Sequence, residues 1–440
     1  MTARKSPLSV ASARRTAAVA LGGPARAAVG EDGAFSYGFD RADGTLSRGA
    51  GASCHIDAAA LPAGEEPAGL FGLSAGGAEA LYCRSGKLYA RTAGAFSDTG
   101  VNFAAVPASV RFFDGAEEKL ALSDGVSVAV LGAQGCAAAE NIPPFSSAAF
   151  WYERLWTFAG SGAEYSAPAD PASFAAARGG GGSVSFPDAA GEIEAAVTFR
   201  GGLFLLRGRG VQELSARGDE RAFCLDDVCA CPRLYGATAA AAPEGVFWLS
   251  ESGLCRFDGS KVQPFAEDFA GFFAGVEQPA ARGAVWRGNY VLSARARLGG
   301  EEEDVLALFR CDGSGGYILR HAAQGLASCG DAVTFVHGGA VYRLTEGGPF
   351  AGVYGRAVWA REVRSPYAGG LLRAVRVRAE GSFLLTVRGP RGLRRLPVFD
   401  GERDYPVKLA GDAFALRLES DGPGRVLSLR AEFSKAEVRA

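Results

Sequence analysis

The feature that most constrains this chain is a hairpin pattern that recurs along most of its length, in which two short apolar strands flank a tight polar turn. Apolar runs bounded by Gly, Asp or Asn are typical of β-hairpins, because these residues adopt the backbone angles of a tight turn at little cost. Seven copies of the pattern are recognisable. Their turns are Arg84-Ser85-Gly86, Asp124-Gly125, Glu153, Arg200-Gly201-Gly202, Gly253, Gly288-Asn289 and Gly338-Gly339.

The spacing of these hairpins predicts a β-propeller. Turn centres at residues 85, 124, 153, 201, 252, 288 and 338 are separated by 29 to 51 residues, with a mean of about 42. A four-stranded propeller blade occupies about 40–45 residues. We therefore predict an all-β protein with a propeller of about seven hairpin-based blades over residues 30–350. A string of β-sandwich hairpins is the alternative, because strand spacing alone separates these folds poorly.

The pattern changes after about residue 350. Apolar and polar residues largely alternate in the segments 372–378, 414–418 and 426–430, as in strands with one buried and one wet face. Residues 351–440 contain 17 Lys and Arg against 10 Asp and Glu, a net charge of +7. We expect a small, basic, C-terminal β-sandwich domain.

The first 29 residues form a third segment with its own character. They contain five basic residues and no acid. The apolar stretch at 17–22 is too short for a secretion signal, so we predict a mobile basic arm in the cytosol, residues 1–29. Nowhere does the chain contain the run of about 18 apolar residues that a membrane-spanning helix requires.

Charge is distributed unevenly between these segments. Residues 30–350 carry 24 basic and 38 acidic side chains, a net charge of −14. The basic C-terminal domain could face nucleic acid or an acidic partner. Solvated strand faces that happen to use Arg are the favoured interpretation, because these arginines alternate along several strands and do not gather beside stacking aromatic residues.

The cysteines indicate a reducing compartment. There are nine, an odd number, with no C-x-x-C pair, which argues against a disulfide framework in a chain of this size. We expect free, unligated thiols. The positions are Cys54, Cys83, Cys136, Cys224, Cys229, Cys231, Cys255, Cys311 and Cys329.

One short motif suggests nucleophilic catalysis. Residues 72–76 read Gly-Leu-Ser-Ala-Gly and match the G-x-S-x-G elbow that presents a serine above an α/β-hydrolase sheet. That elbow needs a strand, a helix and a downstream histidine, whereas this stretch lies in a Gly- and Ala-rich β segment. His321 and His337 could act with Ser74 only by coincidence, and the position of His337 in a hairpin turn predicts surface exposure.

Metal and phosphate motifs are incomplete. Cys224, Cys229 and Cys231 have a spacing that matches no common zinc site, so a loop of small buried thiols is expected. The acidic run 301–304 lacks the alternating ligands of a calcium loop and predicts a solvated hairpin tip. Residues 85–87, Ser-Gly-Lys, lack the rest of a phosphate-binding loop.

A glycosidase motif is also only partial. Residues 96–103 are similar to the Asp-box of sialidases, but one residue is missing between Ser97 and Asp98, and Phe103 stands where that motif has Trp. A glycosidase would also need two carboxylates at a defined separation. We therefore predict no catalytic residue, no cofactor-binding residue, no metal ligand and no cofactor, and a protein that is not an enzyme.

Residues 148–214 contain a strand–gap–strand passage at 152–158, then Glu164-Tyr165-Ser166 followed by Asp170-Pro171 and Phe174, and then the segments 199–206 and 208–214. These segments resemble the propellers of bacteriophage tail hub and nozzle proteins. Residues 43–51 resemble the opening of related virion or prophage proteins. The similarity extends mainly over residues 40–345. Arg154 and Trp156 within it need no role beyond packing in a blade.

This resemblance implies a structural component of a bacteriophage or prophage-derived virion, a tail hub, nozzle or neck ring protein. Such a protein would form a homo-oligomeric ring with other tail or neck proteins around the DNA path, with non-specific contact to packaged DNA and none to a membrane. Its expected location is the virion, and the host cytoplasm during assembly. A carbohydrate-binding or glycoside-hydrolysing β-propeller is the alternative function.

Overall fold

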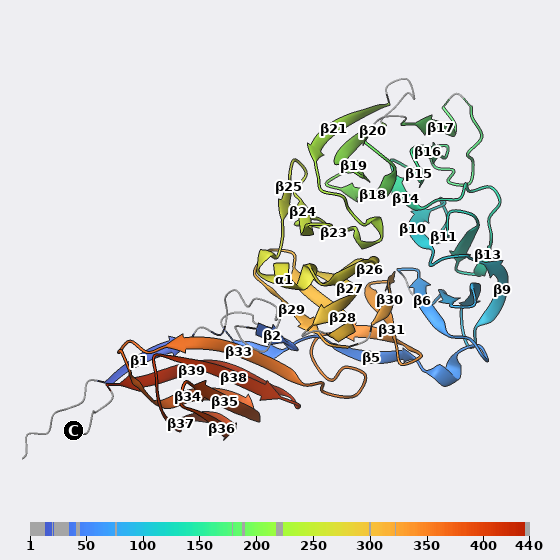
Figure 1. Cartoon of the computed structure of the whole chain (residues 1–440). Coiled ribbons are helices and arrows are strands. Elements are labelled where there is room, and N and C mark those ends of the chain that lie inside the picture. Colours follow the sequence, from blue (N-terminus) through green and yellow to red (C-terminus); the bar gives the residue numbers. More distant parts are fainter. Residues whose placement is uncertain are drawn as a thin grey trace, which may run out of the picture. The chain divides into compact units, whose positions relative to one another are not determined.

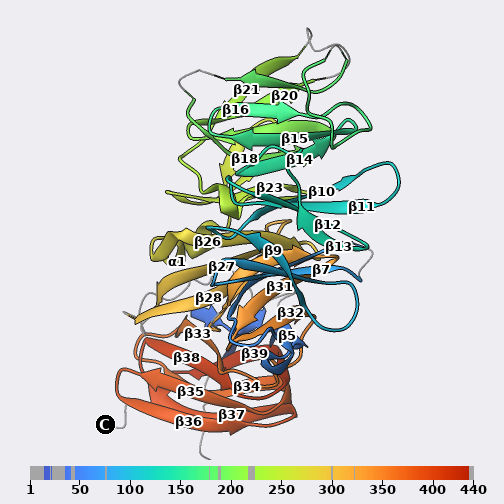
Figure 2. The same ribbon diagram turned by 90° about the vertical axis from the view of Figure 1, so that its right-hand side faces the viewer.

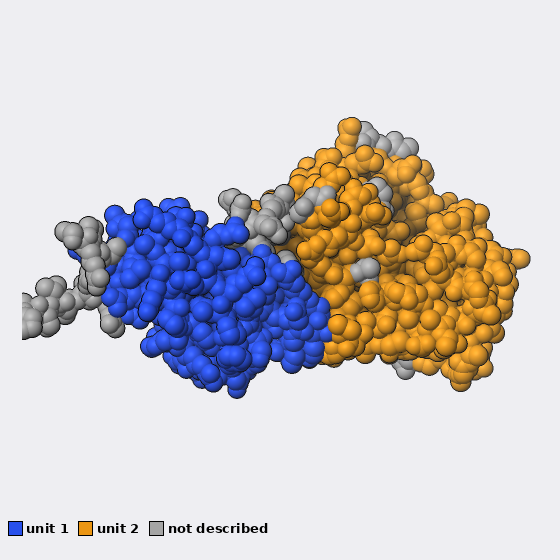
Figure 3. Space-filling model, turned by 60° about the horizontal axis from the view of Figure 1, so that its bottom comes forward, with its two compact units in different colours: residues 1–49, 354–440 blue, residues 50–353 orange. Residues whose placement is uncertain are grey.

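A computed structural model describes residues 14–19, 21, 35–40, 45–74, 77–177, 179–186, 190–216, 223–298, 301–321 and 323–435. The chain forms two compact units, shown in Figure 3: Ala50–Val353, here called the propeller unit, and Met1–Gly49 with Tyr354–Ala440, here called the sandwich unit. Helices are short in the described part of the chain. They are the 3-10 turns Ala58–Ala60, Gly236–Thr238 and Glu267–Phe269, and α1 (Ala270–Phe273).

The propeller unit consists of antiparallel four-stranded blades that follow one another in chain order (Figure 1). Blades 1 to 3 are β6 (Pro67–Gly72), β7 (Glu79–Cys83), β8 (Lys87–Arg91) and β9 (Ser97–Asn102); β10 (Ala108–Phe113), β11 (Glu118–Ser123), β12 (Val128–Gly132) and β13 (Gly135–Ala138); and β14 (Ser147–Trp151), β15 (Arg154–Ala159), β16 (Gly162–Tyr165) and β17 (Gly182–Ser185).

Blades 4 to 6 repeat the same order. They are β18 (Ile193–Phe199), β19 (Gly202–Arg207), β20 (Gly210–Ser215) and β21 (Cys224–Ala230); β22 (Ala240–Ala242), β23 (Gly245–Ser250), β24 (Gly253–Phe257) and β25 (Val262–Pro264); and β26 (Val276–Trp286), β27 (Asn289–Leu298), β28 (Glu301–Arg310) and β29 (Gly316–Leu319). Blade 7 combines the two ends of the unit. It contains β30 (Gln324–Cys329), β31 (Ala332–His337), β32 (Ala340–Thr345) and β5 (Gly51–Ile56).

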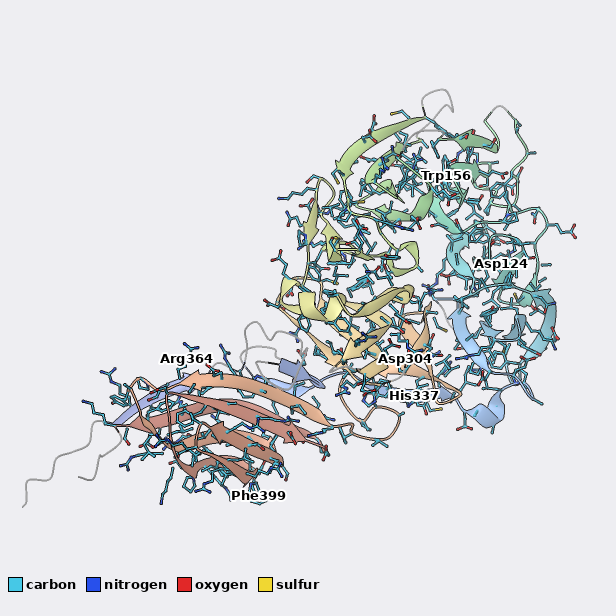
Figure 4. The ribbon with its side chains drawn as sticks, viewed as in Figure 1. Asp124, Trp156, Asp304, His337, Arg364 and Phe399 are labelled. Carbon is cyan, nitrogen blue, oxygen red and sulfur yellow. The ribbon has the colours of Figure 1, made fainter. Side chains whose placement is uncertain are left out.

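Burial explains why strands within one blade differ in sequence. Every residue of β7, β19 and β23 is buried, because neighbouring blades cover both faces of a strand in the middle of a blade. Such strands read as continuous apolar runs. The outermost strands β13, β17 and β21 contain no buried residue and are rich in small or polar residues. Apolar clusters fill the spaces between successive blades, for example between blades 3 and 4 around Trp156, labelled in Figure 4.

The seven hairpins predicted from the sequence fall in seven different blades, which confirms the propeller and its blade number. Their uneven spacing has a simple cause. The turns near residues 85, 124, 252 and 338 join the second and third strands of a blade, whereas those near 153, 201 and 288 join the first and second. An interval is short when a first–second turn follows a second–third turn, and long when the order is reversed.

Blades 1 and 7 are joined where the ring closes. β5, from the start of the unit, pairs antiparallel with β32 and so completes the last blade. The first strands of the two blades, β6 and β30, also form a parallel bridge between Gly72 and Cys329, which makes one eight-stranded sheet of the two blades. Arg111 in blade 2 donates from Nη2 to the carbonyl oxygens of Gly72 (3.2 Å) and Gly330 (3.0 Å). Three blades are therefore tied together at this point.

The sandwich unit packs two sheets face to face, and their strands separate into two groups in Figure 2. The first sheet contains β3 (Phe39–Asp40), β4 (Leu46–Arg48), β39 (Gly424–Ser434), β34 (Leu371–Gly381) and β37 (Gly401–Ala410), with β1 (Arg14–Val19) also paired to β39. The second sheet contains β2 (Phe35–Tyr37), β33 (Ala357–Arg364), β38 (Ala413–Ser420), β35 (Phe383–Gly389) and β36 (Gly392–Val398).

The N-terminal boundaries differ from those predicted. Within the segment 1–29, expected to be a mobile arm, Arg14–Val19 forms a strand against β39, and Val19 and Leu21 are buried in the sandwich core. Residues 30–49, assigned to the propeller, contribute Phe39 and Leu46 to that same core. The cause is the length of β39, whose second edge is covered partly by β4 and partly by β1. Arg4, Lys5 and Arg26 lie outside the described residues.

Candidate functional site

A pocket of about 600 Å³ opens where the ring closes, between turns of blades 1, 6 and 7. It lies beside the Gly72–Cys329 bridge, and three of the side chains that line it come from β5, β7 and β32. The ionisable side chains in the lining are His55, Glu79, Arg91, Arg287, Cys329, Asp331 and Arg343. Seven ionisable side chains thus gather around one pocket, which is therefore the candidate site.

Glu79 is the centre of this group. Its side chain starts β7 and is only 8% exposed. Oε1 lies 2.6 Å from Nε2 of His55 and accepts a hydrogen bond from Nη2 of Arg343 at 3.0 Å. Oε2 accepts from Nε of Arg91 at 2.8 Å, and Nη2 of Arg91 lies 2.6 Å from the same oxygen. The buried carboxylate of Glu79 thus contacts two side chains of blade 7, His55 on β5 and Arg343 on β32, and one side chain of its own blade 1, Arg91 on β8.

The protonation state of Glu79 follows from these partners. Burial alone would raise the pKa of a carboxyl group, because it penalises the charged form. Hydrogen bonds from His55 and Arg91, together with their charges, outweigh burial and lower the pKa of Glu79 from 4.5 to about 2. The group is therefore a carboxylate at neutral pH, and it cannot serve as the proton donor of a general acid mechanism.

Cys329 does not have the properties of a nucleophile. Its Sγ lies 3.7 Å from Oε1 of Glu79, at the edge of the cluster. Burial, and after it the neighbouring negative charge of Glu79, raise the pKa of the Cys329 thiol to about 11. Reactive cysteines have a lowered pKa and are thiolates at neutral pH. The contacts of Glu79 and Cys329 are therefore those expected of side chains that hold blades 1 and 7 together, more than those of a catalytic centre.

The residues of the predicted serine motif lie beside this pocket. Gly72 ends β6, and Ser74 lines the pocket and donates its backbone N–H to Oε2 of Glu118 at 2.7 Å. Ala75 and Gly76 lie outside the described residues. The chain continues into strand β7, so the strand–turn–strand geometry is that of a hairpin and not of a hydrolase elbow.

The two histidines considered with Ser74 have aromatic neighbours. The ring of His321 stacks on Phe350 with centroids 4.0 Å apart. His337, labelled in Figure 4, ends β31 and meets Phe350 edge-on at 5.5 Å and Tyr342 at 5.7 Å. The prediction that His337 is simply exposed in a turn was wrong, because this aromatic cluster covers part of its ring. Its side chain is partly buried.

The cysteines form no metal site that the structure describes. Among the described residues, no three His, Cys, Asp or Glu side chains are grouped to hold a metal ion. Cys224 and Cys229 lie on the outer strand β21 and Cys231 follows it; Cys224 is exposed and the other two are partly buried. The expectation of a buried loop was therefore wrong in both respects. All nine cysteines are free thiols.

The acidic run 301–304 opens β28, and three of its four side chains have local partners. Glu302 pairs with Arg297 at 3.0 Å, and Oε2 of Glu303 accepts from Nε of Arg320 at 2.8 Å. Asp304, labelled in Figure 4, accepts from Gln324 at 2.8 Å. The exposed start of the run agrees with the predicted hairpin tip.

The partial Asp-box proves to be strand β9. Asp98 accepts the backbone N–H of Gly100 at 2.8 Å, and the hydroxyl of Thr99 donates to the carbonyl of Leu88 at 2.7 Å. Arg154 is also structural. Its side chain is buried and donates to the carbonyl oxygens of Ser166 (2.7 Å) and Gly180 (2.6 Å).

Many sandwich arginines are paired across their strands. Arg376 makes two hydrogen bonds to Asp404, at 2.6 and 2.8 Å, and Arg356 pairs with Glu419 at 3.0 Å. Arg364, labelled in Figure 4, pairs with Glu362 on its own strand. These contacts favour the interpretation of solvated strand faces over a continuous nucleic-acid surface.

The sequence gives no signal for the cluster around Glu79. His55, Glu79, Arg91 and Arg343 are separated by up to 288 residues, and none of them lies in a motif. Only the closure of the ring brings them together. The sequence predicts that the first and last blades meet, and therefore where contacts between them form. It does not predict which side chains make these contacts. No helix in the described part of the chain is long and apolar enough to cross a membrane.

Comparisons with known proteins return the fold alone. No family model matches the sequence, and no curated protein matches it. Solved structures do match. BamB from Moraxella catarrhalis has a TM-score of 0.40 at 12% identity, over 63% of this chain and 81% of that chain. The Neurospora crassa Pan2 WD40 domain has a TM-score of 0.44 at 8% identity, over 65% and 91%. The RRP9 WD40 repeats have a TM-score of 0.43 at 10% identity, over 67% and 100%. The pairing of its strands shows this chain to be an all-β protein with a seven-bladed β-propeller followed by a β-sandwich.

Proposed function

We propose that this protein is a non-enzymatic structural component of a bacteriophage or prophage-derived virion, a tail hub, nozzle or neck ring protein. In this proposal it assembles with copies of itself and with other tail or neck proteins around the DNA path. Three observations support this role: the sequence resemblance over residues 148–214, the distribution of charge and the chemistry of the candidate site.

The observation that carries the proposal is the separation of charge between the two units. The propeller unit, residues 50–353, has 22 Lys and Arg against 34 Asp and Glu, a net charge of −12. The sandwich unit, residues 1–49 and 354–440, has 24 against 14, a net charge of +10. Like units of two copies repel one another, while unlike units attract. Contacts between unlike surfaces are heterologous, so they close into a ring or continue as a filament.

The candidate site supports a structural role for the ring itself. The carboxylate of Glu79 is committed to three partners on two blades, and its low pKa is unsuited to general acid catalysis. A glycosidase would need a carboxyl group with a raised pKa beside a second carboxylate. These properties favour a rigid propeller that serves as a building block.

Electron microscopy of the purified full-length chain, alone and mixed with tail proteins, tests this proposal. We expect closed rings, or added density on tail structures. Single particles of monomer size under all conditions, combined with binding to glycans on an array, would contradict it and favour a carbohydrate-binding propeller.

A further inference from the structure

The sandwich unit has one edge strand with an excess of positive charge. β36 is the last strand of its sheet, and among the described residues it pairs only with β35. Arg394 and Arg395 are exposed at its centre, and Arg391 precedes it. Leu393 on the same strand is 43% exposed. An edge strand presents unpaired backbone N–H and C=O groups to any strand that can approach it.

The charges on β36 restrict which strand can pair there. Two copies of β36 side by side would bring arginines together, and like charges directly opposite one another destabilise a β-ladder. Pro397 adds a second restriction, because it has no N–H to donate at that end of the strand. The edge is thus protected against self-pairing and suited to a strand with acidic residues at its centre.

The propeller unit contains such a strand. β21 is the outermost strand of blade 4, and among the described residues it pairs only with β20. Asp226 and Asp227 are exposed at its centre, flanked by Leu225 and Val228, which are partly buried. The other outer strands carry at most one acidic residue. These strands are β5, β9, β13, β17, β25 and β29.

We propose that β36 of one copy pairs antiparallel with β21 of another copy. Leu393-Arg394-Arg395-Leu396 then lies opposite Val228-Asp227-Asp226-Leu225. Directly opposed residues in an antiparallel pair point to the same face. This register places Arg394 against Asp227 on one face and Arg395 against Asp226 on the other.

The local contacts leave room for these new pairs. Asp227 accepts one hydrogen bond from Gln212 at 2.7 Å, and Asp226 accepts one from the thiol of Cys224 at 3.0 Å. An ionised carboxylate offers about four acceptor sites. Nε of Arg394 donates to the carbonyl of Val407 at 3.4 Å, which leaves its terminal nitrogens for a partner. Backbone hydrogen bonds provide the affinity of such an added strand, and the side chains provide the register.

This contact rests on the assembly proposed above and gives it a specific interface. The two surfaces are different, so each copy has one of each and copies join head to tail. Exposed ion pairs contribute only about 0.2–1 kcal/mol each, so they select the partner more than they hold it. The backbone hydrogen bonds between β36 and β21 do not depend on salt, whereas the preference for an acidic partner strand does.

Charge reversal on the full-length chain tests the contact by sedimentation velocity. Arg394→Glu with Arg395→Glu, and separately Asp226→Arg with Asp227→Arg, are each expected to weaken self-association about tenfold or more. The chain that carries all four substitutions is expected to regain most of the association, since opposite charges again face one another. Arg394→Gln with Arg395→Gln, which adds no negative charge, is expected to weaken association less than the reversal does.

The matched control is Arg425→Glu with Arg430→Glu, which changes the charge of the same unit equally at two exposed positions of the central strand β39. It is expected to leave association within about twofold of the unchanged chain. Melting curves establish that each variant folds. Association that survives both reversals, or that the fourfold variant fails to restore, would overturn the β36–β21 contact but not the assembly. A chain that never self-associates would overturn both.

Discussion

The indole Nε1–H of Trp151 in blade 3 donates a hydrogen bond to the carbonyl oxygen of Gly201 in the turn of blade 4, at 2.9 Å. The contact is one of a series. Arg200 in that same turn donates to the carbonyl of Asp258 in blade 5 at 3.0 Å. Arg287 in the corresponding turn of blade 6 pairs with Glu346 after the third strand of blade 7. Turns between first and second strands therefore link blades along the ring.

The first–second turns of blades 3 and 4 differ in how easily their residues adopt positive φ angles. Tyr152 and Glu153 have φ values of 47° and 58°, whereas the turn of blade 4 has Gly201 at 82°. Non-glycine residues in this left-handed region are strained, and a tight hairpin turn favours glycine at its second central position. We expect Glu153→Gly to stabilise the protein by about 0.5–1 kcal/mol.

Gly201→Ala is the matched opposite. A Cβ there meets no atom within 4 Å, so its cost is conformational alone. A destabilisation of about 1 kcal/mol is expected. Urea unfolding of the two variants measures both effects, and an unchanged or reduced stability of the Glu153→Gly variant would show that its turn is not strained.

Replacing the carboxylate of Glu79, at the centre of the cluster of ionisable side chains where blades 1 and 7 meet, should destabilise the propeller unit. Glu79→Gln removes the negative charge that Arg91, Arg343 and His55 surround, and replaces one of its two acceptor oxygens by an amide NH2 that can only donate. Breaking a buried ion pair from one side is costly, and we expect a loss of about 2–4 kcal/mol. The control is Glu302→Gln, an exposed partner of Arg297, with an expected loss of about 0.5 kcal/mol or less. Equal effects in thermal unfolding would rule out a special role for Glu79.

The same group should make stability depend on acid pH. The pKa of Glu79 is about 2 in the folded protein and 4.5 for an ordinary glutamate, so the unfolded chain binds this proton first. A lowered pKa stabilises the folded state above about pH 4.5, and this contribution disappears as the pH falls towards 2. It amounts to about 3 kcal/mol.

The unfolding free energies of the natural chain and of Glu79→Gln should therefore converge as the pH falls through this window. Denaturant titrations at a series of pH values measure the difference. A difference that stays constant from neutral pH down to about pH 2.5 would mean that Glu79 has an ordinary pKa.

How far the sequence predicts the structure depends on how local each feature is. The hairpin between β18 and β19 is evident from Phe199-Arg200-Gly201-Gly202, because an apolar strand, a turn and a second apolar strand are contiguous. Even the uneven spacing of the hairpins comes from a regular arrangement. The blade number follows from such segments.

The N-terminal strands were missed for the opposite reason. β3 and β4 have only two and three residues, and β1 pairs with a strand more than 400 residues away. Their place in the sandwich is set by the uncovered edge of β39. The role of Glu79 was missed for the same reason. In the sequence it is only a polar residue at the start of an apolar strand, and its hydrogen bond with Arg343 of blade 7 forms only in the folded propeller. Long-range pairing, and not local pattern, fixes both.

The contact between Gly72 and Cys329 should behave as a packed pair. A Cβ at Gly72 would lie 2.6 Å from Sγ of Cys329 and 3.3 Å from the carbonyl of Ala78. We expect Gly72→Ala to destabilise by about 2 kcal/mol. Cys329→Ala removes the sulfur, so the double variant should be more stable than the sum of the single effects predicts, by about 0.5 kcal/mol or more. Strict additivity in urea unfolding would contradict the close approach.

The central claim is that a chain with units of opposite charge assembles with copies of itself. Light scattering of the purified full-length protein at low salt and at about 1 M salt, where charges are screened beyond about 3 Å, tests it most directly. At low salt we expect the mass of an assembly of several copies. At about 1 M salt we expect a smaller mass that is still above that of a monomer, because salt weakens the contacts between charged side chains but not the backbone hydrogen bonds between β36 and β21. A strict monomer at every salt concentration, alone and with tail proteins, would contradict it.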